Sequence, residues 1–217
     1  RQTFNLLEIS PIKLYKLWSL FKEDLTVNNI KKLLQTRLGF FSLAVLIFWI
    51  KTYIGYQAEF SLGVEGIMQQ FILLINPIAT TILLFSIALY FKSSKKAYIA
   101  LIVVYTLMSI LFFSNVLYYR EFSDFLSVST ILGAGNVSGG LGASTFALLH
   151  ATDFLFLIDI LLLIVLLATK KITLDTRPFK KRYAFAATIV GFTLLAGNLA
   201  LAESDRPQLL ARTFDRN

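Results

Sequence analysis

The chain has 217 residues, of which 56% are hydrophobic, and its formal net charge is +8 at pH 7. Its mean hydropathy of +0.69 is too high for a soluble domain, whose surface must be mostly polar. The absence of cysteine and the single histidine exclude disulfides, thiolate metal sites and multi-histidine sites. We therefore expect an all-α integral membrane protein. Because the sequence opens at Arg1 and stops in a polar run, we also expect it to be part of a longer protein.

Residues 1–37 are predicted to form a cytoplasmic amphipathic segment. Leu14, Trp18, Phe21 and Leu25 recur at helical spacing, and lysines occupy other positions of the helical wheel. Scattered basic residues and the lack of an uninterrupted apolar run exclude a secretory signal. The pattern favours an interfacial helix on the anionic inner leaflet, with packing on another protein as the alternative.

Five later stretches are apolar and long enough to cross about 30 Å of hydrocarbon at about 1.5 Å per residue. The predicted spans are Leu38–Tyr56, Ile67–Phe91, Ala97–Tyr119, Phe154–Thr169 and Tyr183–Ala202. The fourth is the shortest, and we expect the side chain of Asp153 or Lys170 to extend from its end to the interface. Their apolar runs are continuous rather than alternating, which argues against membrane-spanning strands. The fold prediction is therefore a five-helix transmembrane domain over residues 38–202. Residues 203–217 are predicted to be an extracellular linker.

The orientation follows from the 21 lysines and arginines. Seven precede the first span, three lie between spans two and three, and six lie between spans four and five. Only four lie on the opposite side, and Lys51 falls inside the first span. Because cytoplasmic loops are rich in Lys and Arg, we predict a multi-pass cell-membrane protein with a cytoplasmic amino terminus and an extracellular carboxyl terminus. This placement also argues against nucleic-acid binding.

The longest predicted outer connection is Arg120–Asp153, with a glycine-rich middle at residues 133–142. It lacks the Gly-Lys-Ser/Thr ending and the preceding strand of a phosphate-binding loop, so a flexible hinge is the favoured interpretation. His150, near its end, is interpreted as an exposed loop residue.

Five polar residues are predicted to lie in the outer half of the spans. Counting along the helices places Lys51 about 10 Å and Asp159 about 9 Å below the outer face, so we predict that they form an ion pair. Asn76, Asn115 and Asn198 lie at similar outer positions. One interpretation is that these residues form hydrogen bonds between helices. The other is a polar cup open to the outer leaflet.

A set of motifs carries a resemblance to a known family. The motifs are Trp49–Tyr53, Glu59–Gly63, Ile75–Pro77, Ser114–Arg120 with Phe122–Phe125, and above all Ala202–Asn217. On these residues, the chain from about Arg37 onward resembles the membrane part of the lipoteichoic acid synthase family of Gram-positive bacteria. It departs from the family in a longer segment before Arg37 and in Ala211, where a hydroxyl residue is expected. These departures leave open whether the resemblance is to a polymerising synthase or to a primase.

The resemblance implies an enzyme in which five membrane helices precede an extracellular alkaline-phosphatase-like catalytic domain. Such an enzyme transfers glycerol phosphate from phosphatidylglycerol, through a covalent threonine intermediate at a manganese site, to a glycolipid-anchored acceptor. No catalytic residue, cofactor or metal ligand is expected within these 217 residues, and Thr213 is not the expected nucleophile. The implied partners are membrane lipids, above all phosphatidylglycerol, and the protein's own catalytic domain. A transporter or flippase module and a passive anchor are the alternatives.

Substrate contacts are predicted at the outer interface. Arg120 directly follows Tyr118 and Tyr119, and a guanidinium can hold a phosphate through two hydrogen bonds, so we predict that Arg120 with Tyr119 contacts the lipid headgroup. Further candidate substrate-binding residues are Asn115, Asp124, Lys51 and Asp159, with Arg206 and Arg212 as other headgroup contacts. The alternative is that Arg120 pairs with Glu121 or Asp124, or extends to the interface.

Overall fold

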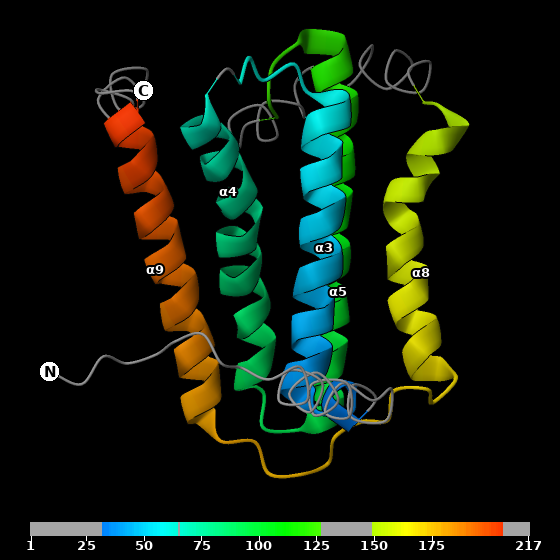
Figure 1. Cartoon of the computed structure of the whole chain (residues 1–217). Coiled ribbons are helices and arrows are strands. Elements are labelled where there is room, and N and C mark those ends of the chain that lie inside the picture. Colours follow the sequence, from blue (N-terminus) through cyan, green and yellow to red (C-terminus); the bar gives the residue numbers. More distant parts are fainter. Residues whose placement is uncertain (1–31, 65, 127–148, 206–217) are drawn as a thin grey trace, which may run out of the picture.

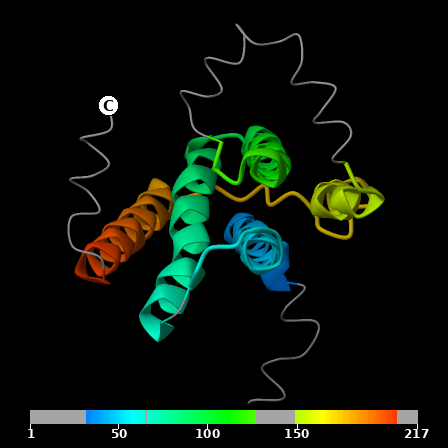
Figure 2. The ribbon, with the colours of Figure 1, turned by 90° about the horizontal axis from the view of Figure 1, so that it is seen from above.

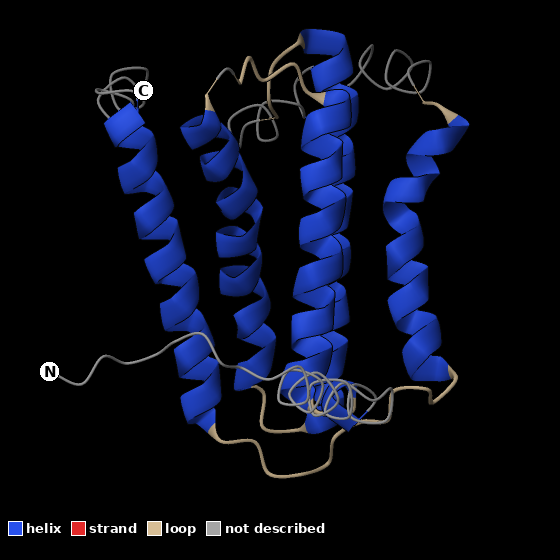
Figure 3. Ribbon diagram, viewed as in Figure 1, coloured by secondary structure: helices blue, strands red, loops and turns tan. Residues whose placement is uncertain are grey.

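The structure is a computed structural model, which describes residues 32–64, 66–126 and 149–205. Every regular element within these residues is a helix (Figures 1 and 3). The helices are α3 (Arg37–Glu59), α4 (Ile67–Ser86) with the 3-10 helix η1 (Ile87–Tyr90), α5 (Ser94–Phe122), the 3-10 helix η3 (Ala151–Phe154) with α8 (Leu155–Ala168), and α9 (Lys181–Asp205). Each of these five segments is long and apolar enough to cross a membrane. The five predicted spans are therefore confirmed.

Three predicted features lie outside the described residues. They are the amphipathic helix before residue 32, the glycine-rich part of the loop at residues 133–142, and the linker after residue 205. Helices α3, α5 and α9 run past the predicted spans at both ends, whereas η1 and α8 each end one residue before the predicted end. The sequence criterion counted apolar residues only, whereas a helix continues as long as its backbone groups bond within it.

Helices α3, α4 and α5 form the centre of the bundle (Figure 2). Three buried rings, Phe48 from α3, Phe85 from α4 and Tyr105 from α5, meet with centroids 5.4 to 5.5 Å apart. Such spacing is typical of favourable edge-on and tilted aromatic pairs. This aromatic contact fixes the three helices against one another and leaves α8 and α9 on opposite flanks (Figure 2).

Helix α9 packs on α4 through small residues. Ala184, Gly191 and Asn198, its buried residues, recur every seven positions and so lie along one stripe of the helix. A Cβ added at Gly191 would lie 3.0 Å from the Leu83 backbone, so glycine permits the close approach. Thr188, on the same side, shares a hydrogen bond of 3.0 Å with the hydroxyl of Ser86. The α4–α9 contact is thus close and continuous.

Helix α8 is attached differently. Asp159 and Leu163 are its buried residues, and most of its leucine, isoleucine and valine side chains are exposed. It lies beside α5 and α3, apart from α4 and α9 (Figures 1 and 2). Dispersion contacts between α8 and the rest of the bundle are therefore few.

We call the end of the bundle where α3, α5 and α9 finish the outer end, because the sequence predicts that it faces outside, and the opposite end the inner end. At the inner end the connection between α8 and α9 is held to the start of α3. The Arg37 backbone N–H donates to Asp175 at 3.2 Å. Arg177 also donates to this carboxylate, and that hydrogen bond holds the pKa of Asp175 below its usual value. Asp175 therefore keeps its charge as the pH falls, until the pH reaches this lowered pKa.

Candidate functional site

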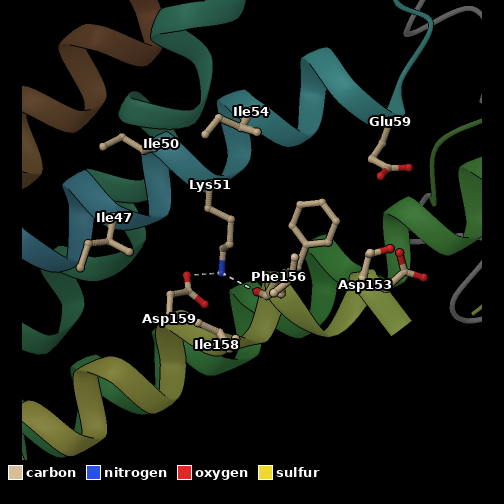
Figure 4. Close-up of a pocket in the computed structure, with 11 residues that line it drawn as sticks. Ile47, Ile50, Lys51, Ile54, Glu59, Asp153, Phe156, Ile158 and Asp159 are labelled. Carbon is tan, nitrogen blue, oxygen red and sulfur yellow. Dashed lines mark hydrogen bonds and ion pairs between the residues drawn. The ribbon is translucent and has the colours of Figure 1, made fainter. Parts of the chain in front are cut away.

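A buried ion pair joins α3 to α8 in the outer half of the bundle. Lys51 Nζ lies 2.7 Å from Asp159 Oδ2, and the two side chains are 8% and 12% exposed. Figure 4 shows Lys51 extending from α3 to Asp159 and to the carbonyl of Phe156 on α8. The predicted pair is therefore confirmed, which shows that counting residues along each helix placed both charges at matching depths.

All three donors of the Lys51 ammonium have acceptors within the bundle. Besides Asp159, they are Ser109 Oγ at 2.6 Å and the Phe156 carbonyl at 3.2 Å. An ammonium has three N–H groups, so this set satisfies them all. Asp159 in turn accepts hydrogen bonds from the Tyr105 hydroxyl and from the Ile160 backbone. The geometry therefore describes a closed polar network, and the predicted substrate contacts of Lys51 and Asp159 stay predictions.

A second charged group, here called the Arg120 cluster, consists of Arg120, Glu59 and Asp153. It joins the outer ends of α3 and α5 to the 3-10 helix η3, which leads into α8. The guanidinium donates to both oxygens of Asp153, at 2.8 and 2.9 Å. Its Nε and one terminal nitrogen donate to Glu59 Oε2, at 3.0 and 2.8 Å. Asp153 is only 1% exposed, so the bidentate pair is largely desolvated.

The partners of Arg120 differ from those that the sequence suggested. Glu121 and Asp124 were the expected acidic partners, whereas Glu59 and Asp153, from other helices, hold the guanidinium. Arg120 also contacts the ring Nδ1 of His150 at 3.1 Å. Its contacts with Glu59, Asp153 and His150 number five, and a guanidinium has five N–H donors. A lipid phosphate would have to displace one of these acceptors, and the headgroup role of Arg120 stays a prediction.

The other predicted contacts are placed around this cluster. Tyr119 packs its ring on Phe60 with centroids 4.8 Å apart, and its hydroxyl accepts from the Ser61 backbone at 3.2 Å. Asn115 Oδ1 accepts from the Leu126 backbone at 2.8 Å. Asp124 caps the next backbone N–H and is exposed. Tyr119 thus holds the start of the connection after α3, and Asn115 holds Leu126 beyond the end of α5. Arg206 and Arg212 lie outside the described residues.

The five polar residues of the outer half do not form one cup. Lys51 and Asp159 lie between α3 and α8, whereas Asn198 on α9 donates to Asn76 on α4 at 3.3 Å. The two groups are separate because α8 and α9 lie on opposite flanks of the central helices (Figure 2). For Asn76 and Asn198 the interpretation as an interhelical hydrogen bond is confirmed.

A groove lies between α3 and α8, with the ion pair along it and the acidic residues of the Arg120 cluster at its outer end (Figure 4). Its volume is about 440 Å³. This α3/α8 groove has mostly apolar walls, formed by Ile47, Ile50, Ile54, Leu155, Phe156 and Ile158. It combines apolar walls with buried charges, which are features of a ligand site.

Sequence reasoning missed four residues of these networks: Glu59, Tyr105, Ser109 and Asp153. Tyr105 and Ser109 are four positions apart and so share one face of α5. That spacing was readable in the sequence, but nothing indicated that the face turns toward Lys51. The short fourth span suggested that Asp153 or Lys170 extends to the interface, yet Asp153 is buried.

Comparison with known proteins is consistent with this architecture. The model of the lipoteichoic acid synthase N-terminal domain matches residues 26–217. The chain is 42% identical over 187 residues to lipoteichoic acid synthase 1 of Bacillus subtilis. These residues are 86% of this chain and 29% of that protein. It is 43% identical over 180 residues to the lipoteichoic acid synthase of Staphylococcus saprophyticus, covering 83% of this chain and 28% of the relative.

A third relative, the lipoteichoic acid synthase of Staphylococcus aureus strain USA300, is 42% identical over 177 residues, which are 82% of this chain and 27% of that protein. No solved structure matches the chain. The chain thus spans less than a third of the length of these relatives. Because the domain model covers nearly all of it, this chain belongs to the lipoteichoic acid synthase family, as the N-terminal membrane domain.

Proposed function

We propose that this chain is the membrane domain of a glycerophosphotransferase, which transfers glycerol phosphate from phosphatidylglycerol to a glycolipid-anchored acceptor at the outer leaflet. The observation that carries the proposal is the identity of 41–43% to lipoteichoic acid synthases over most of the chain. Because the chain spans less than a third of those relatives, the reaction belongs to a full-length protein with an extracellular catalytic domain. The amino terminus is cytoplasmic in this proposal, and α9 leads to the catalytic domain.

Manganese enters the proposal through the family resemblance alone. The described residues contain no group of three or more His, Cys, Asp or Glu side chains that could hold a metal ion. As the family resemblance implies, the metal belongs to the catalytic domain in this proposal, and no step runs through a metal held by the membrane helices.

The buried charges favour an active membrane domain over a passive anchor. Charged residues are costly within a bilayer and usually mark functional sites. An anchor has no need of an ion pair that is 8% and 12% exposed, or of a second charged group beside it. The membrane helices thus contribute to the reaction by presenting lipid to the catalytic domain as well as by holding that domain at the leaflet.

The test is to express the full-length protein in Gram-positive cells that lack lipoteichoic acid synthesis, and to measure transfer of labelled glycerol phosphate from phosphatidylglycerol. A matched protein carries an unrelated five-helix anchor in place of residues 38–202. We expect polymer from the native protein, loss of transfer after chelation, and recovery with manganese. Equal transfer by the chimaera would favour the passive anchor. No transfer by an abundant native protein would overturn the proposed reaction.

A further inference from the structure

A second pocket, here called the α4/α9 pocket, lies at the outer end of the bundle. Its volume is about 340 Å³, and its walls are mostly apolar. The apolar walls are formed by Leu62, Ile72, Leu73, Leu199 and Ala202. Asp205, the last described residue of α9, also lines the pocket, and Gln69 donates to its carboxylate at 3.0 Å. The pocket therefore lies beside the point where the chain leaves α9, next to the start of α4 (Figure 1).

The inner part of the pocket holds acceptors that lack their usual donors. The Asn198 side chain is only 5% exposed, and within the described residues no group donates to its Oδ1 atom. Pro77, inside α4, has no N–H for the carbonyl of Leu73, which lines the same pocket. Leaving a buried polar group without a partner costs free energy. The pocket is therefore suited to an occupant that combines apolar groups with hydrogen-bond donors.

The charges at the outer end favour a basic occupant. In the sequence, residues 59–66, 120–153 and 203–205 together hold seven acidic residues and one arginine. Residues 206–217, which follow α9 directly, hold three arginines and one aspartate. Complementary charges steer two surfaces together and select how they dock. The segment that follows α9 is thus attracted to the outer end of its own bundle.

The same segment carries apolar groups within reach of the pocket. Leu209 and Leu210 are its first large apolar residues, and Leu209 comes four residues after Asp205. Pro207 disfavours a continuation of the helix toward the leucines. Four extended residues span at most about 14 Å, whereas α9 rises by about 10 Å from Asn198 to Asp205. The leucines can therefore reach the full depth of the pocket.

We propose that residues 206–217 bind to the outer end of the membrane domain, with Leu209 or Leu210 in the α4/α9 pocket and the arginines on the acidic surface around it. Backbone N–H groups of the segment supply donors for the acceptors of the pocket. The chain then leaves the bundle at a fixed place and in a fixed direction. The segment thus positions the catalytic domain instead of acting as a loose tether. The inference concerns the linker and goes beyond the transfer reaction, on which it does not depend.

The test measures how fast an impermeant maleimide labels single cysteines in the full-length protein, which carries no other cysteine and is held in nanodiscs of one copy each. The cysteines replace Leu209, Leu210 or Ser204, and Ser204 is the exposed reference on α9. Full burial of one leucine side chain corresponds to about a tenfold change in an equilibrium, or more. We therefore expect at least one of the two leucine positions to react about ten times more slowly than Ser204.

Matched variants connect slow labelling to the pocket and to the charges. Ala202→Trp fills the pocket and should restore fast labelling, whereas Ala200→Trp, at an exposed position of α9 outside the pocket, should not. Ile72→Trp fills the pocket from α4 and replaces Ala202→Trp if that variant is not abundant. Arg212→Glu should also speed labelling, whereas Lys96→Glu, at an exposed residue of the inner end, should not.

Fast labelling of both leucine positions would overturn the docking. Slow labelling that persists in the variants with a filled pocket would mean that lipid or the catalytic domain covers the leucines, and would overturn the choice of site. Glycerol phosphate transfer is measured on the same preparations. An active protein in which both leucine positions label fast counts against the docking only, and an inactive protein with slow labelling counts against the proposed reaction only.

Discussion

The Lys51–Asp159 pair provides the sharpest test of how α8 is held. Two unit charges 2.7 Å apart attract by about 6 kcal/mol at an effective dielectric constant of about 20. Removing both ions from water offsets much of this gain. Removing one partner leaves the other charge buried, which typically costs about 3–5 kcal/mol. We therefore expect Lys51→Met and Asp159→Leu each to lower the free energy of unfolding by about that amount.

The double variant Lys51→Met/Asp159→Leu should be more stable than either single variant, because no charge is left without a partner. The assay is hydrogen exchange by mass spectrometry on the full-length protein across an SDS titration, which follows peptides of α3 and α8 separately from the catalytic domain. Lys96→Met, at an exposed inner residue, is the control. A double variant that loses as much as the two single variants added together, or single variants within about 1 kcal/mol of wild type, would refute the reasoning.

Three further predictions address other contacts. Gly191→Leu should destabilise the α4–α9 contact by about 1–3 kcal/mol in the same exchange assay, whereas Gly197→Leu, with no atom within 4 Å of an added Cβ, should not. Arg120→Ala should lower both the membrane abundance of the full-length protein and its transfer activity, because two carboxylates are left facing each other; normal abundance with lost transfer would instead support a direct headgroup contact. A cysteine at the exposed Ser204 should react with an impermeant maleimide on intact cells, and one at the exposed Ser93 should not; the opposite pattern would reverse the orientation.

The spans and the ion pair could be predicted from the sequence, because both depend on the number of residues counted along a single helix. Span length follows from apolar residues at a fixed rise, and depth follows from counting residues to the nearest interface. For Lys51 and Asp159, the span that contains each residue and its depth in that span could both be counted without knowing how the helices pack. An unpaired charge within a membrane is costly, so the partner of a charged residue is easier to predict than the partner of a neutral one.

The partners of Arg120 depended on information that a single sequence lacks. Glu121 is its neighbour in the chain, but adjacent residues on a helix point in different directions. Asp124 follows Ser123, whose left-handed backbone ends α5, and it caps the next residue instead. The actual partner Asp153 comes from a helix whose rotation about its own axis is fixed only by packing.

The sequence of α8 explains why charges set that rotation. Between Leu155 and Ala168 it is Leu, Ile, Val, Phe or Ala at every position except Asp159, so apolar packing offers no distinct face to turn toward the bundle. Asp153 and Asp159 are six residues apart and contact Arg120 and Lys51 respectively. A turn of α8 by one residue, about 100°, would break both contacts. We therefore expect the two acidic residues to specify the orientation of α8 more than they stabilise it.

One variant can distinguish an effect on the orientation of α8 from an effect on its stability. Lys51→Met/Asp159→Leu should keep α8 in the membrane and folded, but α8 should then occupy more than one rotation, because any of its apolar faces can meet α3 and α5. Spin labels on introduced cysteines at Ile50 and Ile158, which line opposite walls of the α3/α8 groove, report this in a full-length protein with no other cysteine. The paired charges should give one narrow distribution of label distances, and the double variant a broad one. An equally narrow distribution in both proteins would mean that apolar packing alone orients α8.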